Sequence, residues 1–125
     1  MTNESESRLQ QSCYMHFHNS YPHLRGLFFK IKNEGTNRIT GARDKATGLI
    51  AGVADSCLLI PQDFELGQGF QFEPSYCVFI EFKTETGKQS PAQKAWEATV
   101  KAAGYQYHVI KTLEQFKELL KLLDL

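Results

Sequence analysis

The hydrophobic positions of the chain change their spacing from segment to segment, and these changes predict its secondary structure. Helical spacing marks residues 5–19, where Leu9, Cys13 and Phe17 share one stripe. An apolar run over residues 27–31 indicates a strand. The polar residues 33–37 predict a turn, and residues 38–47 predict a short helix closed by Gly48.

The middle of the chain predicts two further strands. Residues 53–60 form a mostly apolar run stopped by Pro61, which is typical of a buried strand. Residues 76–83 are rich in β-branched and aromatic side chains and give the clearest strand. Residues 62–75 contain two glycines and a proline with little periodicity, so we expect a loop or an irregular hairpin arm there, a candidate for substrate contact.

Two capping signals organise the C-terminal part. Ser90, Pro91 and Gln93 match an N-cap, a first-turn proline and a capping-box residue, so a helix is expected over residues 91–103. A strand follows at residues 105–110. Thr112 and Gln115 repeat the capping box before a leucine-rich helix over residues 113–123, which is too short for a coiled coil and is interpreted as a cover for the core.

The alternation of these elements predicts an α/β fold with a central mixed β-sheet flanked by helices, in a single domain over residues 1–125. The 42% of hydrophobic and 22% of charged residues are ordinary for a globular domain. Lys plus Arg and Asp plus Glu both count 14, so a surface for nucleic acid would need an uneven distribution of charge. The chain has no run of about 18 apolar residues and starts with polar residues, so we expect a cytoplasmic protein with no membrane contact.

Other patterns exclude some kinds of site. The three cysteines lack a Cys-x-x-Cys spacing and are expected to be buried free thiols. The four histidines follow no zinc-binding spacing, and no Gly-x-Ser-x-Gly elbow for a serine nucleophile is present.

The chemistry of the chain concentrates on Asp55, Glu81 and Lys83. Side chains alternate along a strand, so Glu81 and Lys83 share one face while Phe82 points into the core on the other. A charge on such an apolar strand is costly unless it is paired or binds a metal. An ion pair between Glu81 and Lys83, and a turn role for Asp55, are the plain alternatives. Taken together, the three residues favour a site with two carboxylates and an ammonium, which suits metal-assisted phosphodiester cleavage.

Three stretches carry a family resemblance: residues 52–55 (Gly-Val-Ala-Asp), 79–83 (Phe-Ile-Glu-Phe-Lys) and 87–93 (Gly-Lys-Gln-Ser-Pro-Ala-Gln). They resemble the VRR-NUC branch of the PD-(D/E)XK nuclease superfamily, in its stand-alone phage and bacterial form. The resemblance implies a restriction endonuclease-like core, and it covers most of the chain. It extends over further residues on both sides, namely Glu6, Gln10, Lys32, Asn33, Gly35, Gly104, Tyr105 and Tyr107.

The resemblance also implies roles for individual residues. Asp55, Glu81 and the backbone carbonyl of Phe82 would hold Mg²⁺ or Mn²⁺, and Lys83 would be the catalytic lysine. Gln93 would support the site from its helix. Glu6 would be the first-helix acid; Glu4 is the competing choice, but its spacing to Leu9 puts it off the buried stripe. The proline that usually precedes the first acid is replaced by Ala54, which removes backbone stiffness but no functional group.

The expected function is hydrolysis of DNA by a metal-activated water, with selectivity for branched structures similar to that of Holliday-junction resolvases. Such enzymes are expected to be homodimers. A flap or general DNA nuclease, a nuclease fold that binds nucleic acid without cutting it, and a structural or adaptor domain remain as alternatives. Candidate contacts to nucleic acid are Lys32, Asn33, Arg38, Arg43, Lys45, Lys88 and Lys94.

Overall fold

The computed structural model describes residues 2–32, 38–61 and 74–125. Within these ranges the order of helices and strands is the one that the hydrophobic pattern predicts, with a short 3-10 turn, η1, added. The predicted turn at residues 33–37 and most of the predicted loop, residues 62–73, lie outside the described part. The elements are α1 (Thr2–Ser20), η1 (Pro22–Leu24), β1 (Phe28–Lys30), α2 (Arg38–Ala46), β2 (Ser56–Ile60), β3 (Tyr76–Phe82), α3 (Pro91–Ala102), β4 (Gln106–Ile110) and α4 (Leu113–Leu122).

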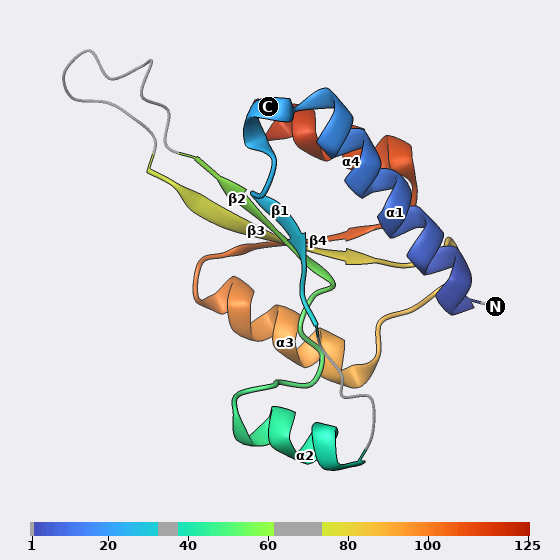
Figure 1. Cartoon of the computed structure of the whole chain (residues 1–125), viewed down its shortest axis with the longest axis vertical. Coiled ribbons are helices and arrows are strands. Elements are labelled where there is room, and N and C mark those ends of the chain that lie inside the picture. Colours follow the sequence, from blue (N-terminus) through green and yellow to red (C-terminus); the bar gives the residue numbers. More distant parts are fainter. Residues whose placement is uncertain (1, 33–37, 62–73) are drawn as a thin grey trace.

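The four strands form one mixed sheet in the order β1-β2-β3-β4. β1 pairs with β2 and β2 with β3 in antiparallel fashion, whereas β3 and β4 are parallel. The parallel pair needs a crossover connection, which α3 provides. Figure 1 shows α1 and α4 together on one side of the sheet and α3 on the other, so the predicted α/β architecture with a mixed, helix-flanked sheet is confirmed.

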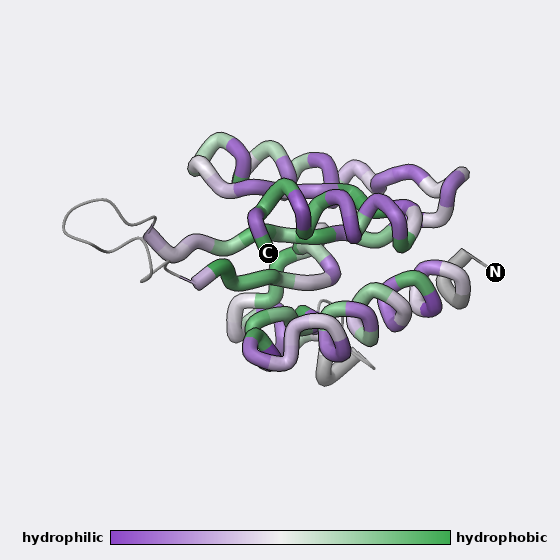
Figure 2. The backbone as a smooth tube through the Cα atoms, turned by 90° about the horizontal axis from the view of Figure 1, so that it is seen from above, coloured by the Kyte–Doolittle hydropathy of each residue, from purple (hydrophilic) through white to green (hydrophobic). Residues whose placement is uncertain are grey.

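The hydrophobic core lies between the sheet and the pair α1 and α4. Both helices alternate hydrophobic and hydrophilic residues along their length, as Figure 2 shows, and turn their apolar stripes toward the strands. The predicted stripe of α1 is largely buried, because Cys13 and Phe17 are inaccessible to solvent and Leu9 packs partly buried against them. The other members of this core include Phe28, Leu58, Ile60, Val78, Ile80, Phe82, Ile110, Phe116, Leu119 and Leu120.

The capping box predicted at α3 is complete, whereas the one predicted at α4 forms only in part. The Ser90 hydroxyl accepts a hydrogen bond from the Gln93 backbone N–H at 3.1 Å, and the Gln93 side chain accepts one from the Ser90 N–H at 2.8 Å. This complete capping box fixes the start of α3. At α4 the Thr112 hydroxyl accepts from the Gln115 N–H at 3.1 Å, while the Gln115 side chain reaches back to the Lys111 N–H.

Several predicted boundaries need correction. The strand predicted from residue 53 begins at Ser56, so Asp55 directly precedes β2, and β3 ends at Phe82, one residue before Lys83. β4 begins at Gln106, because the Tyr105 N–H closes the end of α3 by bonding to the Val100 carbonyl at 3.0 Å. α1 starts at Thr2, earlier than the hydrophobic stripe indicates.

The cysteines are expected to be buried free thiols, and no helix is expected to cross a membrane. Cys13 and Cys57 are buried free thiols as predicted, but Cys77 is half-buried. Burial raises the pKa of Cys13 to about 12, and burial together with contact to Cys77 raises the pKa of Cys57 to about 11. In the described ranges no helix is long and apolar enough to cross a bilayer.

Candidate functional site

Asp55 and Glu81 lie opposite each other at one end of the neighbouring strands β2 and β3. The antiparallel register pairs Ser56 with Ile80, so Asp55 and Glu81 are the next opposite positions at this end of the sheet. Side chains at opposite positions share one face of the sheet. The fold therefore brings together two acids that are 26 residues apart in the sequence.

The Asp55 side chain also replaces a missing backbone partner. The Phe82 N–H lies beyond the last paired residues of β2 and β3, and it donates to Asp55 Oδ2 at 2.7 Å. This bond explains why β2 starts later than the apolar run: the carboxylate, not the backbone, continues the contact with β3. On an extended strand the N–H and C=O of one residue point toward the same neighbouring strand, so the Phe82 carbonyl faces the Asp55 side as well.

Lys83 completes the predicted trio. Its backbone N–H donates to the Ile110 carbonyl at 3.0 Å, which extends the contact of β3 with β4 by one residue. Two positions after Glu81, it projects from the same face of the strand, while Phe82 is buried in the core on the other. Burial raises the pKa of both Asp55 and Glu81, and the positive charge of Lys83 acts to lower both values. The three predicted charges therefore act on one another in the folded chain.

Glu81 is completely buried. Its Oε1 accepts a hydrogen bond from the Tyr107 hydroxyl, and its Oε2 is buried with no hydrogen-bond partner among the described residues. Burial raises the pKa of Glu81, and the negative charges of Asp55 and Glu97 act in the same direction; the Tyr107 bond and Lys83 oppose them. An unpartnered buried carboxylate oxygen is costly unless a proton or a cation satisfies it.

A chain of polar side chains under α3 holds this acid in place. Gln89 Nε2 donates to Glu97 Oε1 at 3.0 Å and to the Tyr107 hydroxyl at 3.4 Å. Glu97 in turn forms an ion pair with Lys101 at 2.6 Å, and this contact lowers the pKa of Glu97. Burial and the bond to Glu81 raise the pKa of Tyr107 well above its ordinary value, so it stays a hydrogen-bond donor. The sequence pattern assigns no role to these residues.

Asp55 is held by different neighbours. Its backbone carbonyl accepts from the Ile31 N–H at 2.8 Å, which ties it to the end of β1. Burial raises the pKa of the Asp55 carboxyl, against the lowering effects of the Phe82 bond, Lys83 and Lys30. Lys30 was not predicted as a site residue, because only the pairing of β1 with β2 brings it near Asp55.

The loop before Asp55 is packed tightly against α3. Gly52 adopts a φ of +84°, and a Cβ on it would collide with the backbone of Ala92 and Gln93. Glycine is therefore required there by both conformation and space. Ala54, which directly precedes Asp55, is fully buried. The packing of this loop against α3 therefore fixes the position of the Asp55 backbone.

Two predicted helix residues are not joined to the acids. The Gln93 side-chain oxygen is engaged in the capping box, so the structure gives it a role in starting α3 and no bond to Asp55 or Glu81. Glu6 is half-buried on α1, and among the described residues no hydrogen bond or ion pair links it to either acid. One turn later, Gln10 Nε2 donates to the Ser56 hydroxyl at 3.2 Å, which anchors α1 beside the site.

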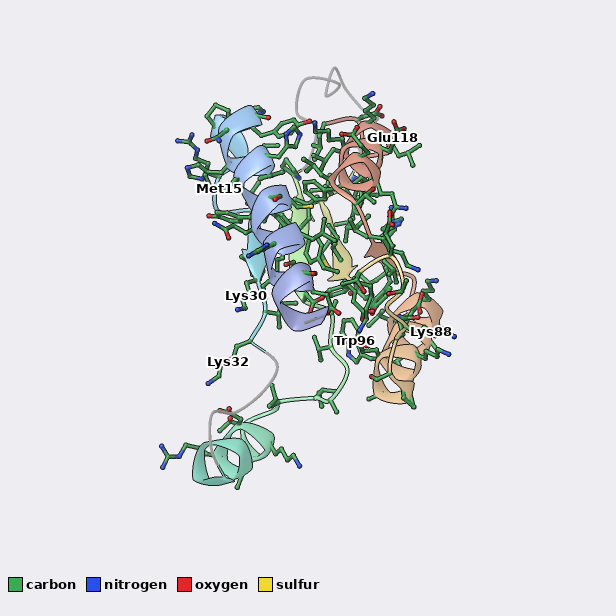
Figure 3. All side chains as sticks on the ribbon, turned by 90° about the vertical axis from the view of Figure 1, so that its right-hand side faces the viewer. Met15, Lys30, Lys32, Lys88, Trp96 and Glu118 are labelled. Carbon is green, nitrogen blue, oxygen red and sulfur yellow. The ribbon has the colours of Figure 1, made fainter. Side chains whose placement is uncertain are left out.

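The predicted contacts to nucleic acid are spread over separate surfaces. Lys32 forms an ion pair with Asp44 at 3.5 Å, which links the end of β1 to α2. Figure 3 shows Lys30 and Lys32 projecting on the side away from α3, whereas Lys88 lies next to α3. The other predicted contacts are Arg38, Arg43 and Lys45 on α2 and Lys94 on α3, while Asn33 falls outside the described residues.

The residues at this site fit a hard divalent cation. Mg²⁺ is commonly bound by one or two carboxylates together with waters and phosphate oxygens. Asp55, the orphaned oxygen of Glu81 and the Phe82 carbonyl would supply such a set. No group of three His, Cys, Asp or Glu side chains in the described ranges is placed to hold a metal, so a cation here would need the carbonyl and water as further ligands.

The sequence was also compared with known proteins. No protein-family model and no curated protein matches the chain. The assignment of a function therefore depends on the residues and the geometry of the site.

Proposed function

We propose that this protein is a metal-dependent nuclease that hydrolyses phosphodiester bonds in DNA. The observation that carries the proposal is the position of Asp55 and Glu81 at adjacent strand ends, within the electrostatic reach of Lys83. Two carboxylates and an ammonium on one sheet face are the groups that metal-assisted cleavage requires. The unpartnered buried oxygen of Glu81 supports the same conclusion, because a bound cation would satisfy it.

Each residue has a defined task in this proposal. Asp55, Glu81 and the Phe82 carbonyl would hold Mg²⁺ or Mn²⁺, which would supply an activated water and offset charge on the scissile phosphate. Lys83 orients the attacking water and offsets the charge that develops on the phosphate. Tyr107 holds Glu81 in its buried position by donating to Oε1. Glu6 remains a candidate first-helix acid.

We also propose that the chain is a single VRR-NUC-like domain with a restriction endonuclease-like core. The mixed sheet with helices on both faces is compatible with such a core. The acids lie at opposite positions at one end of β2 and β3, and the helix that follows carries the glutamine of the resembling stretch in its first turn. These features support the proposal together with the three sequence stretches that resemble the family.

The proposed substrate is branched DNA, cut by a homodimer. A two-fold enzyme presents two equivalent sites, which suits the two strands cut at a four-way junction. Sedimentation velocity tests the assembly: a monomer at micromolar concentration that retains full cleavage activity would contradict the dimer.

The proposal is tested by incubating the protein with labelled linear duplex, single-stranded, flap and four-way-junction DNA in Mg²⁺, Mn²⁺ or EDTA. Lys83→Ala is the diagnostic variant, and Lys121→Ala, an exposed lysine of α4, is its matched control. We expect metal-dependent cutting that the control retains and Lys83→Ala loses.

The choice of substrate separates a junction resolvase from a flap or general nuclease. No cutting of any DNA by folded protein that still binds metal would overturn the nuclease assignment in favour of binding without cleavage.

A further inference from the structure

A groove lies beside the candidate site, between α1 and the first two strands. Its volume is about 260 Å³. This is slightly less than the usual size of sites for drug-sized ligands, so the groove suits one small group. Its lining comes from three elements: Ser7, Gln10, Gln11 and Tyr14 on α1, Phe28 and Lys30 on β1, and Ser56 on β2.

Tyr14 gives this groove an accessible aromatic wall. The side chain is 43% exposed, although it is one of the larger apolar groups of α1. Its ring is supported from behind, stacked with His18 at a centroid distance of 5.9 Å and tilted against Phe28 at 6.2 Å. An aromatic ring that is held in place and partly open to solvent is a platform on which a planar group can stack.

The polar groups of the groove suit the two other parts of a nucleotide, the edge of the base and the phosphate. The amides of Gln10 and Gln11 and the hydroxyl of Ser7 can donate and accept hydrogen bonds, as the edge of a base requires. Lys30 adds an exposed positive charge suited to a phosphate. The groove thus combines a stacking surface, base-edge partners and a cation within one small volume.

The groove lies at the same end of the sheet as Asp55, on the face that α1 covers, whereas Glu81 faces α3. Ser56 lines it and directly follows Asp55, and the charge of Lys30 acts on the Asp55 carboxyl. The Gln10 to Ser56 hydrogen bond closes the groove at the residue next to Asp55. A strand seated in the groove would therefore have to pass around this end of the sheet to reach Asp55.

We propose that this groove binds one unpaired nucleotide of a DNA strand, with the base stacked on Tyr14 and a neighbouring phosphate beside Lys30. The inference rests on the proposed nuclease function, and it narrows the substrate class to DNA with a single-stranded or unstacked segment next to the cut. Base-paired DNA keeps its bases stacked within the duplex and would not fill the groove.

The test measures binding in EDTA, by fluorescence anisotropy, to a labelled thymidine 20-mer and to a fully paired hairpin. Tyr14→Ala should weaken binding of the single strand about tenfold, as expected when one stacking ring is removed, and leave hairpin binding unchanged. Tyr14→Phe should restore it, and Met15→Ala, an exposed neighbour outside the groove, should change neither. Lys30→Gln should reduce the slope of log affinity against log salt by about 0.7.

The outcomes separate this inference from the nuclease proposal. Single-strand binding that neither Tyr14→Ala nor Lys30→Gln alters would overturn the groove assignment, even if Lys83-dependent cleavage is present. Loss of binding in these variants of a protein that cuts no DNA would support the groove while the nuclease fails. Lys30→Gln keeps the test decisive if Tyr14→Ala does not fold, because Lys30 lies outside the core.

Discussion

The hydroxyl of Tyr107 donates a hydrogen bond to the fully buried carboxylate of Glu81. The two residues lie on parallel neighbouring strands, where Tyr107 pairs with Phe79, two positions before Glu81. This contact is the main support that the described residues give to the acid, because the other Glu81 oxygen has no partner among them. The bond therefore links the position of a candidate metal ligand to the register of β3 and β4.

Replacing Tyr107 by phenylalanine should destabilise the protein. Tyr107→Phe leaves both oxygens of a buried carboxylate without a donor, so we expect a loss of about 1–3 kcal/mol in the free energy of unfolding. Urea denaturation measures it. Tyr105→Phe is the matched control, because Tyr105 is 48% exposed and packs its ring against Phe79. Equal losses in the free energy of unfolding for the two variants would mean that the hydrogen bond to Glu81 does not stabilise the protein.

Glu81 should make the stability of the protein depend on pH. Burial raises its pKa above the ordinary 4.5, so between pH 4.5 and the folded pKa the folded form binds more protons at Glu81 than the unfolded chain does. Its contribution to stability is fully present below pH 4.5 and is lost as the pH rises through the folded pKa.

We expect Glu81→Gln to melt a few degrees higher than the native protein at pH 8 without divalent ions, and near it at pH 4. The exposed Glu118→Gln is the control. A gain of the same size at both pH values would contradict this origin.

Divalent ions should stabilise the folded protein by offsetting the cost of burying the Glu81 carboxylate. A ligand that binds only the folded state at a hundred times its Kd adds about 2.7 kcal/mol of stability. Mg²⁺ or Mn²⁺ should therefore raise the melting temperature of the native protein, and Asp55→Asn or Glu81→Gln should abolish the rise. Asp55→Asn still offers an oxygen to the Phe82 N–H, so its fold should persist. Asp124→Asn controls for non-specific binding, and a rise retained in both site variants would exclude metal binding at this site.

Two glycines offer a matched test of how Asp55 is positioned. Gly48 and Gly52 both adopt positive φ, but only a Cβ on Gly52 would collide, with the backbone of α3. Each alanine substitution should cost about 1–2 kcal/mol in backbone strain. Gly52→Ala should lose about 1–3 kcal/mol more from overpacking and should also weaken metal binding. Calorimetry of unfolding and of Mn²⁺ binding compares the two, and equal losses would mean that the loop yields without displacing Asp55.

The basic residues predict a salt-dependent affinity for DNA. Replacing Lys88 and Lys94 together by glutamine should weaken duplex binding and flatten its dependence on salt, by about 0.9 in slope for each phosphate that the protein no longer neutralises. Lys117 and Lys121, changed in the same way on α4, are the control. An unchanged salt slope would show that Lys88 and Lys94 are solvated surface charges.

Much of the fold could be predicted from the sequence, because its signals are local. The capping box at Ser90 and the N-cap bond at Thr112 specify the starts of α3 and α4 through residues three positions apart. The alternation of β3 places Phe82 in the core and Glu81 on the opposite face. Asp55, Glu81 and Lys83 could be chosen because charged residues within or beside apolar strands are rare enough to require a reason.

The support around these acids could not be predicted in the same way. Tyr107 and Gln89 reach Glu81 and Glu97 only through the parallel register and the course of α3, which no local spacing encodes. The predicted start of β2 is wrong because the apolar pattern does not reveal that a side chain replaces the backbone contact. Gly52 did carry a signal: a glycine beside a strand often marks close backbone approach.

Alternate residues of β3 face opposite sides of the sheet and have different roles. Val78, Ile80 and Phe82 build the core with α1 and α4, while Phe79 and Glu81 face α3. A change of Glu81 to glutamine therefore leaves the main core intact and removes the cost of burying a carboxyl group. Forms of this protein that lose the Glu81 carboxylate should fold as well as the native one or better, so neither expression level nor heat resistance will reveal that this acid has been lost.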